Sequence, residues 1–157
     1  MDEAMTRQEK AVQYFRDGFH CSQAVLASFA KECGLTEEQA LRLGSCFGGG
    51  MRRGEVCGAC TGALMVLGSL YGQYDPEEAG SRERSNEVTD RMTLGFEETC
   101  GSCLCRGILG YDISTPEGKK QAREKKLFEE RCPQMVANAV TVLEKIIGER
   151  QQQWKVK

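Results

Sequence analysis

Four cysteines in this chain each stand where a helix is predicted to begin: Cys21, Cys57, Cys105 and Cys132. A helix start offers unpaired backbone N–H groups and a partial positive charge. Both stabilise a thiolate and can bring a cysteine pKa from ~8.5 down into the range of ~3.5–7.5. Because the thiolate is the form that attacks disulfides and binds metals, the pattern predicts one site at which several helix starts meet a cluster of sulfur atoms.

The total number of cysteines is high, nine in 157 residues. In a reducing compartment a framework of structural disulfides is disfavoured, and an odd count leaves at least one thiol unpaired in a monomer. Three explanations remain: metal ligation, redox chemistry, and packing of a buried thiol as a small hydrophobe. For Cys33 and Cys46, which stand near predicted helix ends, packing is the favoured interpretation.

Two C-x-x-C spacings add to the pattern: Cys57 with Cys60, and Cys100 with Cys103, the latter extended by Cys105. Two such pairs are compatible with a tetrahedral zinc site, although the interval between them is far longer than in a zinc ribbon. A thioredoxin-like role for the first pair would need a βαβ setting, which the sequence does not indicate. For Cys60, tight helix packing and a catalytic role are equally supported.

The segment from Gly54 to Leu64 reads GEVCGACTGAL. Its C-G-A-x-x-G core resembles a family of small proteins named for the cysteine pattern C–GCAxxG–C–C, to which a redox role is ascribed. The resemblance extends from Cys21 to about Ile147. Carried over residue by residue, the four pattern cysteines of the family fall on Cys21, Cys57, Cys105 and Cys132. The resemblance implies redox activity and does not imply a particular substrate.

A run of glycines, Gly48-Gly49-Gly50, precedes this core. A phosphate-binding P-loop requires Lys and Ser or Thr after its last glycine, whereas Glu55 and Val56 follow Gly54 here. The glycines are therefore predicted to let the backbone approach the cysteine site closely.

Three basic residues flank these motifs. Arg52 and Arg53 are expected to be solvated, with compensation of nearby negative charge as the alternative. His20, the only histidine, stands next to Cys21. Because hydrolytic Cys–His catalysis would depend on this one residue, a cysteine hydrolase is disfavoured.

The hydrophobic pattern predicts an all-α, single-domain bundle of about six or seven helices. Residues 1–150 are expected to form one helical, cysteine-rich redox domain, and residues 151–157 are expected to be a frayed tail. Thr6 and Thr36 each open a capping box. Helices are expected over about 7–17, 21–33, 37–47, 57–71 and 85–98, with a short helix from 105, a charged segment from 116 and a last helix after 132.

Composition excludes several classes of protein. A net charge of −2 gives no reason to expect nucleic-acid binding. The sequence contains no run of about 18 apolar residues, so membrane insertion is not expected. The charged N-terminus does not match a secretory signal, so a cytoplasmic location is expected. The partner is expected to be a redox protein of unknown identity, and the oligomeric state is left open.

Three functions follow from the cysteines. The first is electron transfer by an iron–sulfur cluster held by Cys21, Cys57, Cys105 and Cys132. The second, without a cofactor, is a thiol–disulfide oxidoreductase in which Cys57 attacks and Cys60 or another pattern cysteine is its partner. The third is a non-enzymatic scaffold with a structural zinc site of four cysteines. Colour and metal content would separate these alternatives.

Overall fold

The computed structural model describes residues 4–156, with side chains described to residue 152. The chain is all-α: helices make up 71% of the structure, and the described residues form no strand beyond one isolated antiparallel bridge between Val56 and Leu104. The helices are α1 (Arg7–Arg16), α2 (Cys21–Ser28), α3 (Glu37–Gly44), α4 (Gly58–Tyr71), α5 (Ser81–Cys100), α6 (Cys105–Leu109), α7 (Pro116–Glu124), α8 (Leu127–Glu130) and α9 (Cys132–Val156), with a tight turn η1 (Gly50–Gly54) before α4.

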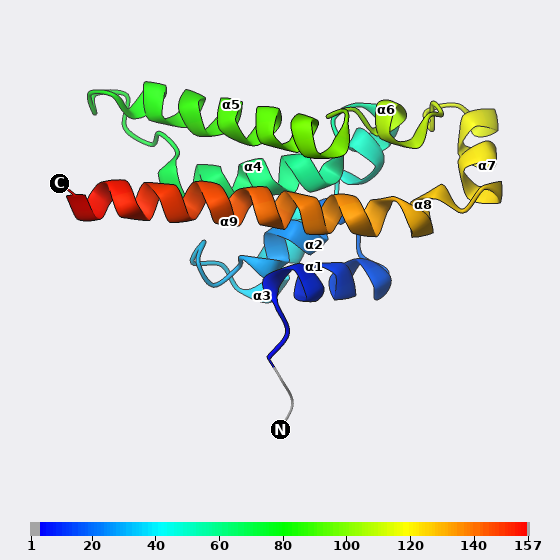
Figure 1. Ribbon diagram of the computed structural model, residues 1–157, viewed down its shortest axis with the longest axis horizontal. Coiled ribbons are helices and arrows are strands. Elements are labelled where there is room, and N and C mark those ends of the chain that lie inside the picture. Colours follow the sequence, from blue (N-terminus) through cyan, green and yellow to red (C-terminus); the bar gives the residue numbers. More distant parts are fainter. Residues whose placement is uncertain (1–3, 157) are drawn as a thin grey trace.

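The long helix α9 runs the length of the molecule (Figure 1). Helices α4 and α5 pack on one side of it, and α1 and α2 pack on the other. Helix α2 occupies the centre, because it contacts α1, α3, α4 and α9. Helix α7 crosses one end of the molecule close to α6 and α8. The predicted all-α bundle is confirmed.

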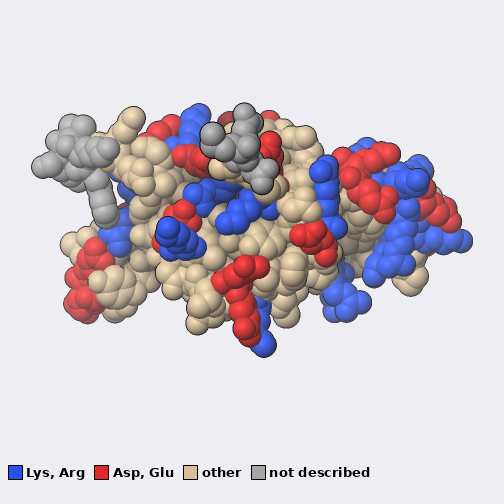
Figure 2. All heavy atoms as spheres, turned by 90° about the horizontal axis from the view of Figure 1, so that it is seen from below, with Lys and Arg blue, Asp and Glu red and all other residues tan. Residues whose placement is uncertain are grey.

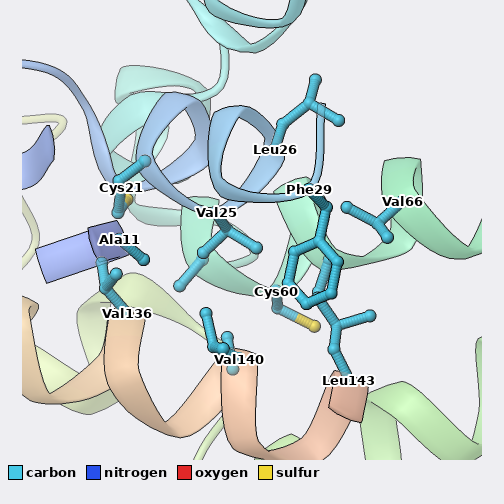
Figure 3. Packing of buried hydrophobic residues seen from close by; sticks show 14 of the residues in the cluster. Ala11, Cys21, Val25, Leu26, Phe29, Cys60, Val66, Val136, Val140 and Leu143 are labelled. Atoms are coloured by element: carbon cyan, nitrogen blue, oxygen red, sulfur yellow. The ribbon is translucent and has the colours of Figure 1, made fainter. Parts of the chain in front are cut away.

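The core lies where α2, α4 and α9 meet (Figure 3). Val25 and Leu26 of α2 face this core, as do Val136, Val140 and Leu143 of α9, and all five are at most 1% exposed. The apolar stripe that the sequence predicts for the last helix therefore packs against the helix that begins at Cys21.

Local sequence signals explain where helices α1 and α3 begin. The Thr6 side chain accepts a hydrogen bond from the Glu9 N–H at 3.1 Å, and the Thr6 N–H donates to the Glu9 carboxylate at 2.9 Å. Thr36 and Gln39 repeat this reciprocal arrangement at 3.1 and 2.9 Å. These hydrogen bonds confirm both predicted capping boxes. Each box satisfies two N–H groups that a helix start leaves unpaired.

Before the last helix, three boundaries differ from the prediction by three residues or more, and one of them is the end of α3, which lies at Gly44 and not near residue 47. Helix α2 ends at Ser28, because the Phe29 and Ala30 N–H groups turn to carbonyls three residues back and the chain continues as turns to Gly34. Helix α5 begins at Ser81, where the buried Ser81 hydroxyl donates to the Glu78 carbonyl at 2.8 Å.

The C-terminal helix is also longer than the sequence suggests. The backbone of α9 continues to Val156, through most of the segment expected to fray. Lys157 lies outside the described residues.

Candidate functional site

The four pattern cysteines line one cavity of about 710 Å³ at the end of the molecule. Cys21 is the first residue of α2, Cys105 of α6 and Cys132 of α9, and Cys57 immediately precedes α4. Residues 111 positions apart in the sequence, from 21 to 132, thus meet at four helix starts. The metal-ligand and catalytic roles expected for them stay predictions.

The two glycines of the C-G-A-x-x-G core set the distance between α2 and α4. A Cβ atom at Gly58 would lie 2.5 Å from the Cys21 Sγ atom, and one at Gly62 would lie 2.7 Å from the Ser22 carbonyl oxygen. Real Cβ atoms do not approach other atoms so closely, so only glycine permits this contact. Gly58 and Gly62 are four positions apart, which places both glycines on the same face of α4, toward the start of α2.

The glycine run before the core forms a turn of left-handed backbone. Gly49, Gly50, Met51 and Arg52 have φ angles of 64°, 60°, 59° and 61°. For a residue with a side chain this conformation costs roughly 1–2 kcal/mol. The turn brings the Gly49 N–H close to the Cys21 sulfur, and this N–H acts as a hydrogen-bond donor to the sulfur. The predicted close approach of the glycines to the cysteine site is therefore present.

Cys21 is the one thiol of this cavity whose pKa is lowered. The Cys57 thiol, which donates a hydrogen bond to the Cys21 sulfur, is the main reason that the pKa of Cys21 falls to about 7. Burial opposes the shift, while backbone N–H groups of Gly49, Ser22 and Ala59 add to it. Such N–H groups at a helix start favour the thiolate over the thiol.

The other three thiols of the cavity shift the opposite way. The pKa of Cys57 is raised well above its ordinary value, because its proton is shared with Cys21 and because it is buried. Burial and the nearby negative charge of Cys21 raise the pKa of Cys105 to about 11 and that of Cys132 to about 12. At neutral pH the arrangement favours one thiolate among three thiols.

The helix-start pattern predicted a lowered pKa at each of the four cysteines and Cys57 as the attacking thiol, whereas in the structure the pKa of Cys21 is lowered and that of Cys57 is raised. In a buried pair that shares a proton, the thiolate forms at the sulfur with more N–H donors. Cys21 has three such donors, whereas Cys57 has only the Ala59 N–H. A helix start alone does not decide the pKa, because burial and neighbouring charges contribute as much.

Cys60 does not belong to this cavity. It is fully buried in the core among α2, α4 and α9 (Figure 3), and its thiol interacts with Cys103 and Cys100. Burial raises the pKa of Cys60 to about 12. The Cys103 thiol donates to the Thr93 carbonyl at 3.2 Å. The C-x-x-C spacing therefore divides its two cysteines between two groups of thiols.

Backbone pairing holds the segments before α4 and α6 side by side. The Cys57 N–H donates to the Cys103 carbonyl and the Cys105 N–H donates to the Glu55 carbonyl, each at 2.7 Å. The Glu55 carboxylate also pairs with Arg106 at 3.1 Å. These hydrogen bonds between distant segments place Cys57 and Cys105 at the same cavity. No sequence motif predicts the bonds.

Basic side chains line the cavity as well. Arg52 comes from η1, and Lys119 and Arg123 come from α7. His20 lines the same cavity, and its ring fills the space that a side chain at Gly48 would occupy. The spacing of four residues between Lys119 and Arg123 is the only sequence signal for the contribution of α7.

A comparison with protein families gives a match over residues 19–146 to C_GCAxxG_C_C, described as a putative redox-active protein. The chain belongs to this family. The match includes all four cysteines that line the cavity and both glycines that set the distance between α2 and α4. Comparison with the curated proteins and comparison with the solved structures each give no match.

The family description names no metal, so the fit of a metal has to be judged from the side chains. Among residues 4–156, no three His, Cys, Asp or Glu side chains are grouped as a metal ion requires. The close contact within the cavity is a pair, Cys21 with Cys57. In this arrangement the cysteines do not form a ready metal site. None of the described helices could cross a membrane.

Proposed function

We propose that this redox protein is a thiol–disulfide oxidoreductase in which Cys21 is the attacking thiolate and Cys57 the resolving thiol. The observation that carries the proposal is that Cys21 and Cys57 line one open cavity as neighbours and that the Cys57 thiol lowers the pKa of Cys21. Two thiols in such contact can close a disulfide with little movement of the backbone.

The reaction with a disulfide R–S–S–R′ balances as two exchanges. The Cys21 thiolate attacks one substrate sulfur, a Cys21–S–S–R bond forms, and R′–S⁻ leaves with the electron pair of the broken bond. The Cys57 sulfur then attacks the Cys21 sulfur, and R–S leaves with the proton that Cys57 gives up. The protein loses two electrons and the substrate gains two. A dithiol on an extended segment of a partner protein, in a cytoplasmic setting, would supply those electrons by the reverse exchange.

Cys105 and Cys132 have a supporting role in this proposal. Their raised pKa values keep them protonated at neutral pH, so they do not compete with Cys21 as nucleophiles. They keep the cavity apolar near the Cys21 sulfur. Cys60 and Cys103 are not in the cavity and take no part in the exchange.

An iron–sulfur cluster is the second candidate. It is favoured by the convergence of four cysteines from four helix starts on one cavity. It would need the side chains of Cys105 and Cys132 to move toward the close pair, since no group of three ligands stands ready among the described residues. A structural zinc site would need the same movement, with nothing further in its favour.

Anaerobic purification with iron, zinc and sulfide analysis separates these candidates. For the oxidoreductase we expect less than stoichiometric metal and, after treatment with 2-hydroxyethyl disulfide, a Cys21–Cys57 bond found by peptide mapping. The Cys57→Ser variant should trap a mixed disulfide on Cys21, whereas Cys33→Ser, outside the cavity, should react as the unaltered protein does. Stoichiometric iron and sulfide lost on Cys105→Ser would replace the proposal with the cluster.

A further inference from the structure

The walls of the cysteine cavity carry charge of one sign. Its lining includes Arg52, Lys119 and Arg123 and contains no Asp or Glu. Two cations near the cavity do have an acidic partner: Lys120 pairs with Glu124 at 3.9 Å and Arg106 with Glu55 at 3.1 Å. Within residues 4–156, none of the three lining cations has such an ion pair.

Several acidic residues stand next to lining residues in the sequence, among them Asp17, Asp112, Glu117 and Glu124, and none of them lines the cavity itself. Asp112 stands two positions before Ser114, which lines the cavity. The Asp112 carboxylate accepts from the Ser114 N–H at 3.0 Å and from the Ser114 hydroxyl at 2.5 Å. Figure 2 shows blue side chains gathered with some red ones at the end of the molecule that α7 forms. The positive lining therefore belongs to the cavity itself, while the surrounding surface is mixed.

Most of the remaining side chains of the lining are apolar, with His20, Ser114 and Thr115 as the polar ones, and the space is small. Phe15, Phe19, Ile113, Phe128 and Met135 line the cavity, whose volume is about 710 Å³. Cavities of roughly 300–1,000 Å³ with an apolar lining and a few charged groups are typical of small-molecule sites. A folded protein could not enter this space, but a molecule of a few tens of atoms could.

We propose that the cavity binds a small organic disulfide that carries a carboxylate or another anionic group. The anion would face Arg52, Lys119 and Arg123, the carbon chain would contact the aromatic lining, and the S–S bond would reach Cys21. This inference rests on the proposed function and deepens it, because it names the class of substrate. The exchange balances as before, with R and R′ carrying the negative charge and leaving as anionic thiols.

Three small disulfides that differ in charge test the proposal. We would measure modification of Cys21 in the reduced protein by 3,3′-dithiodipropionate, 2-hydroxyethyl disulfide and cystamine, which are anionic, neutral and cationic. Each rate is divided by the rate of the same disulfide with 2-mercaptoethanol, which removes the intrinsic reactivity. We expect the anionic disulfide to react about 10-fold faster than the neutral one, and cystamine to be slowest, as for electrostatic steering into a charged cleft.

Matched variants locate the preference. The double variant Lys119→Gln, Arg123→Gln and the single variant Arg52→Gln should each reduce the ratio of the anionic rate to the neutral rate. Lys120→Gln is the control, since Lys120 is on the same helix but pairs with Glu124 and does not line the cavity. Circular dichroism would check that each variant is folded.

A non-reactive probe separates this inference from the proposed function. Octanedioate has the chain length and charge of dithiodipropionate without the S–S bond, and calorimetry would measure its binding. Binding that depends on the three cations, together with the rate preference, supports the proposal. Equal normalised rates for the three disulfides and no octanedioate binding would overturn it while leaving thiol–disulfide exchange intact. If octanedioate binds but no probe modifies Cys21, the anion site stands, and both the disulfide substrate and the proposed function are refuted.

Discussion

Gly58 stands directly against the Cys21 sulfur: a Cβ atom at Gly58 would lie 2.5 Å from Cys21 Sγ and 3.0 Å from the Phe47 carbonyl oxygen. Gly58, the residue that follows Cys57, therefore packs against the side chain of Cys21. This relationship explains why the glycine is part of the cysteine motif. It lets α2 and α4 approach until their first residues form one site.

The first prediction concerns this contact. Gly58→Ala should lower the free energy of unfolding by about 1–3 kcal/mol, as overpacking does, and should slow alkylation of Cys21 because the sulfur must move. Gly68→Ala is the matched control on the same helix, since a Cβ there meets nothing within 4 Å. It should raise stability by roughly 0.5–1 kcal/mol. Denaturant unfolding of both variants decides the matter; equal stabilities would contradict the role given to Gly58.

The second prediction concerns pH. Because the pKa of Cys21 is about 7 and those of Cys105 and Cys132 are about 11 and 12, Cys21 should be the most reactive of these three cavity thiols between pH 6 and 8. The thiolate is the reactive form, so the rate should level off above the pKa. Iodoacetamide labelling of the reduced protein, followed by peptide mapping, measures this profile. A midpoint near ~8.5 for Cys21, the value of an ordinary thiol, would show that the backbone N–H groups do not stabilise its thiolate.

The third prediction concerns the residue after Cys21. The fully buried Ser22 hydroxyl donates to the Gly44 carbonyl at 2.6 Å and so ties α2 to the end of α3. Ser22→Ala leaves that carbonyl unpaired and should cost about 1–3 kcal/mol of stability. Ser45→Ala removes a similar hydroxyl that donates to the Arg42 carbonyl at 2.7 Å near the surface, and should change stability by less than about 0.5 kcal/mol. Thermal unfolding would compare the two.

The fourth prediction separates the two groups of thiols. Cys60→Ser should lower the free energy of unfolding by about 1–3 kcal/mol, because it places a polar hydroxyl in a fully buried site that is packed for a thiol. The rate at which Cys21 reacts with a neutral disulfide should remain unchanged. The exposed Cys46→Ser variant should be neutral on both measures. If Cys60→Ser abolished disulfide exchange at full stability, Cys60 would be the partner of the attacking thiol after all.

The sequence by itself determined the helices and the identity of the cavity cysteines. Capping boxes at Thr6 and Thr36 and the apolar stripe of the last helix are local signals, and the structure follows them. The positions of Cys21, Cys57, Cys105 and Cys132 at helix starts are local as well. Such features depend on residues within one or two turns of each other, so their pattern can be recognised without a fold.

Tertiary structure alone decided which cavity thiol has the lowered pKa and which residues surround it. The lowered pKa of Cys21 depends on donors from Gly49, Ala59 and Cys57, which come from other segments. Cys60 belongs with Cys103 because α4 directs its side chain into the core, and Lys119 reaches the cavity because α7 crosses its end. Burial and charge act through space between residues far apart in the chain, and their balance exists only once the helices have packed.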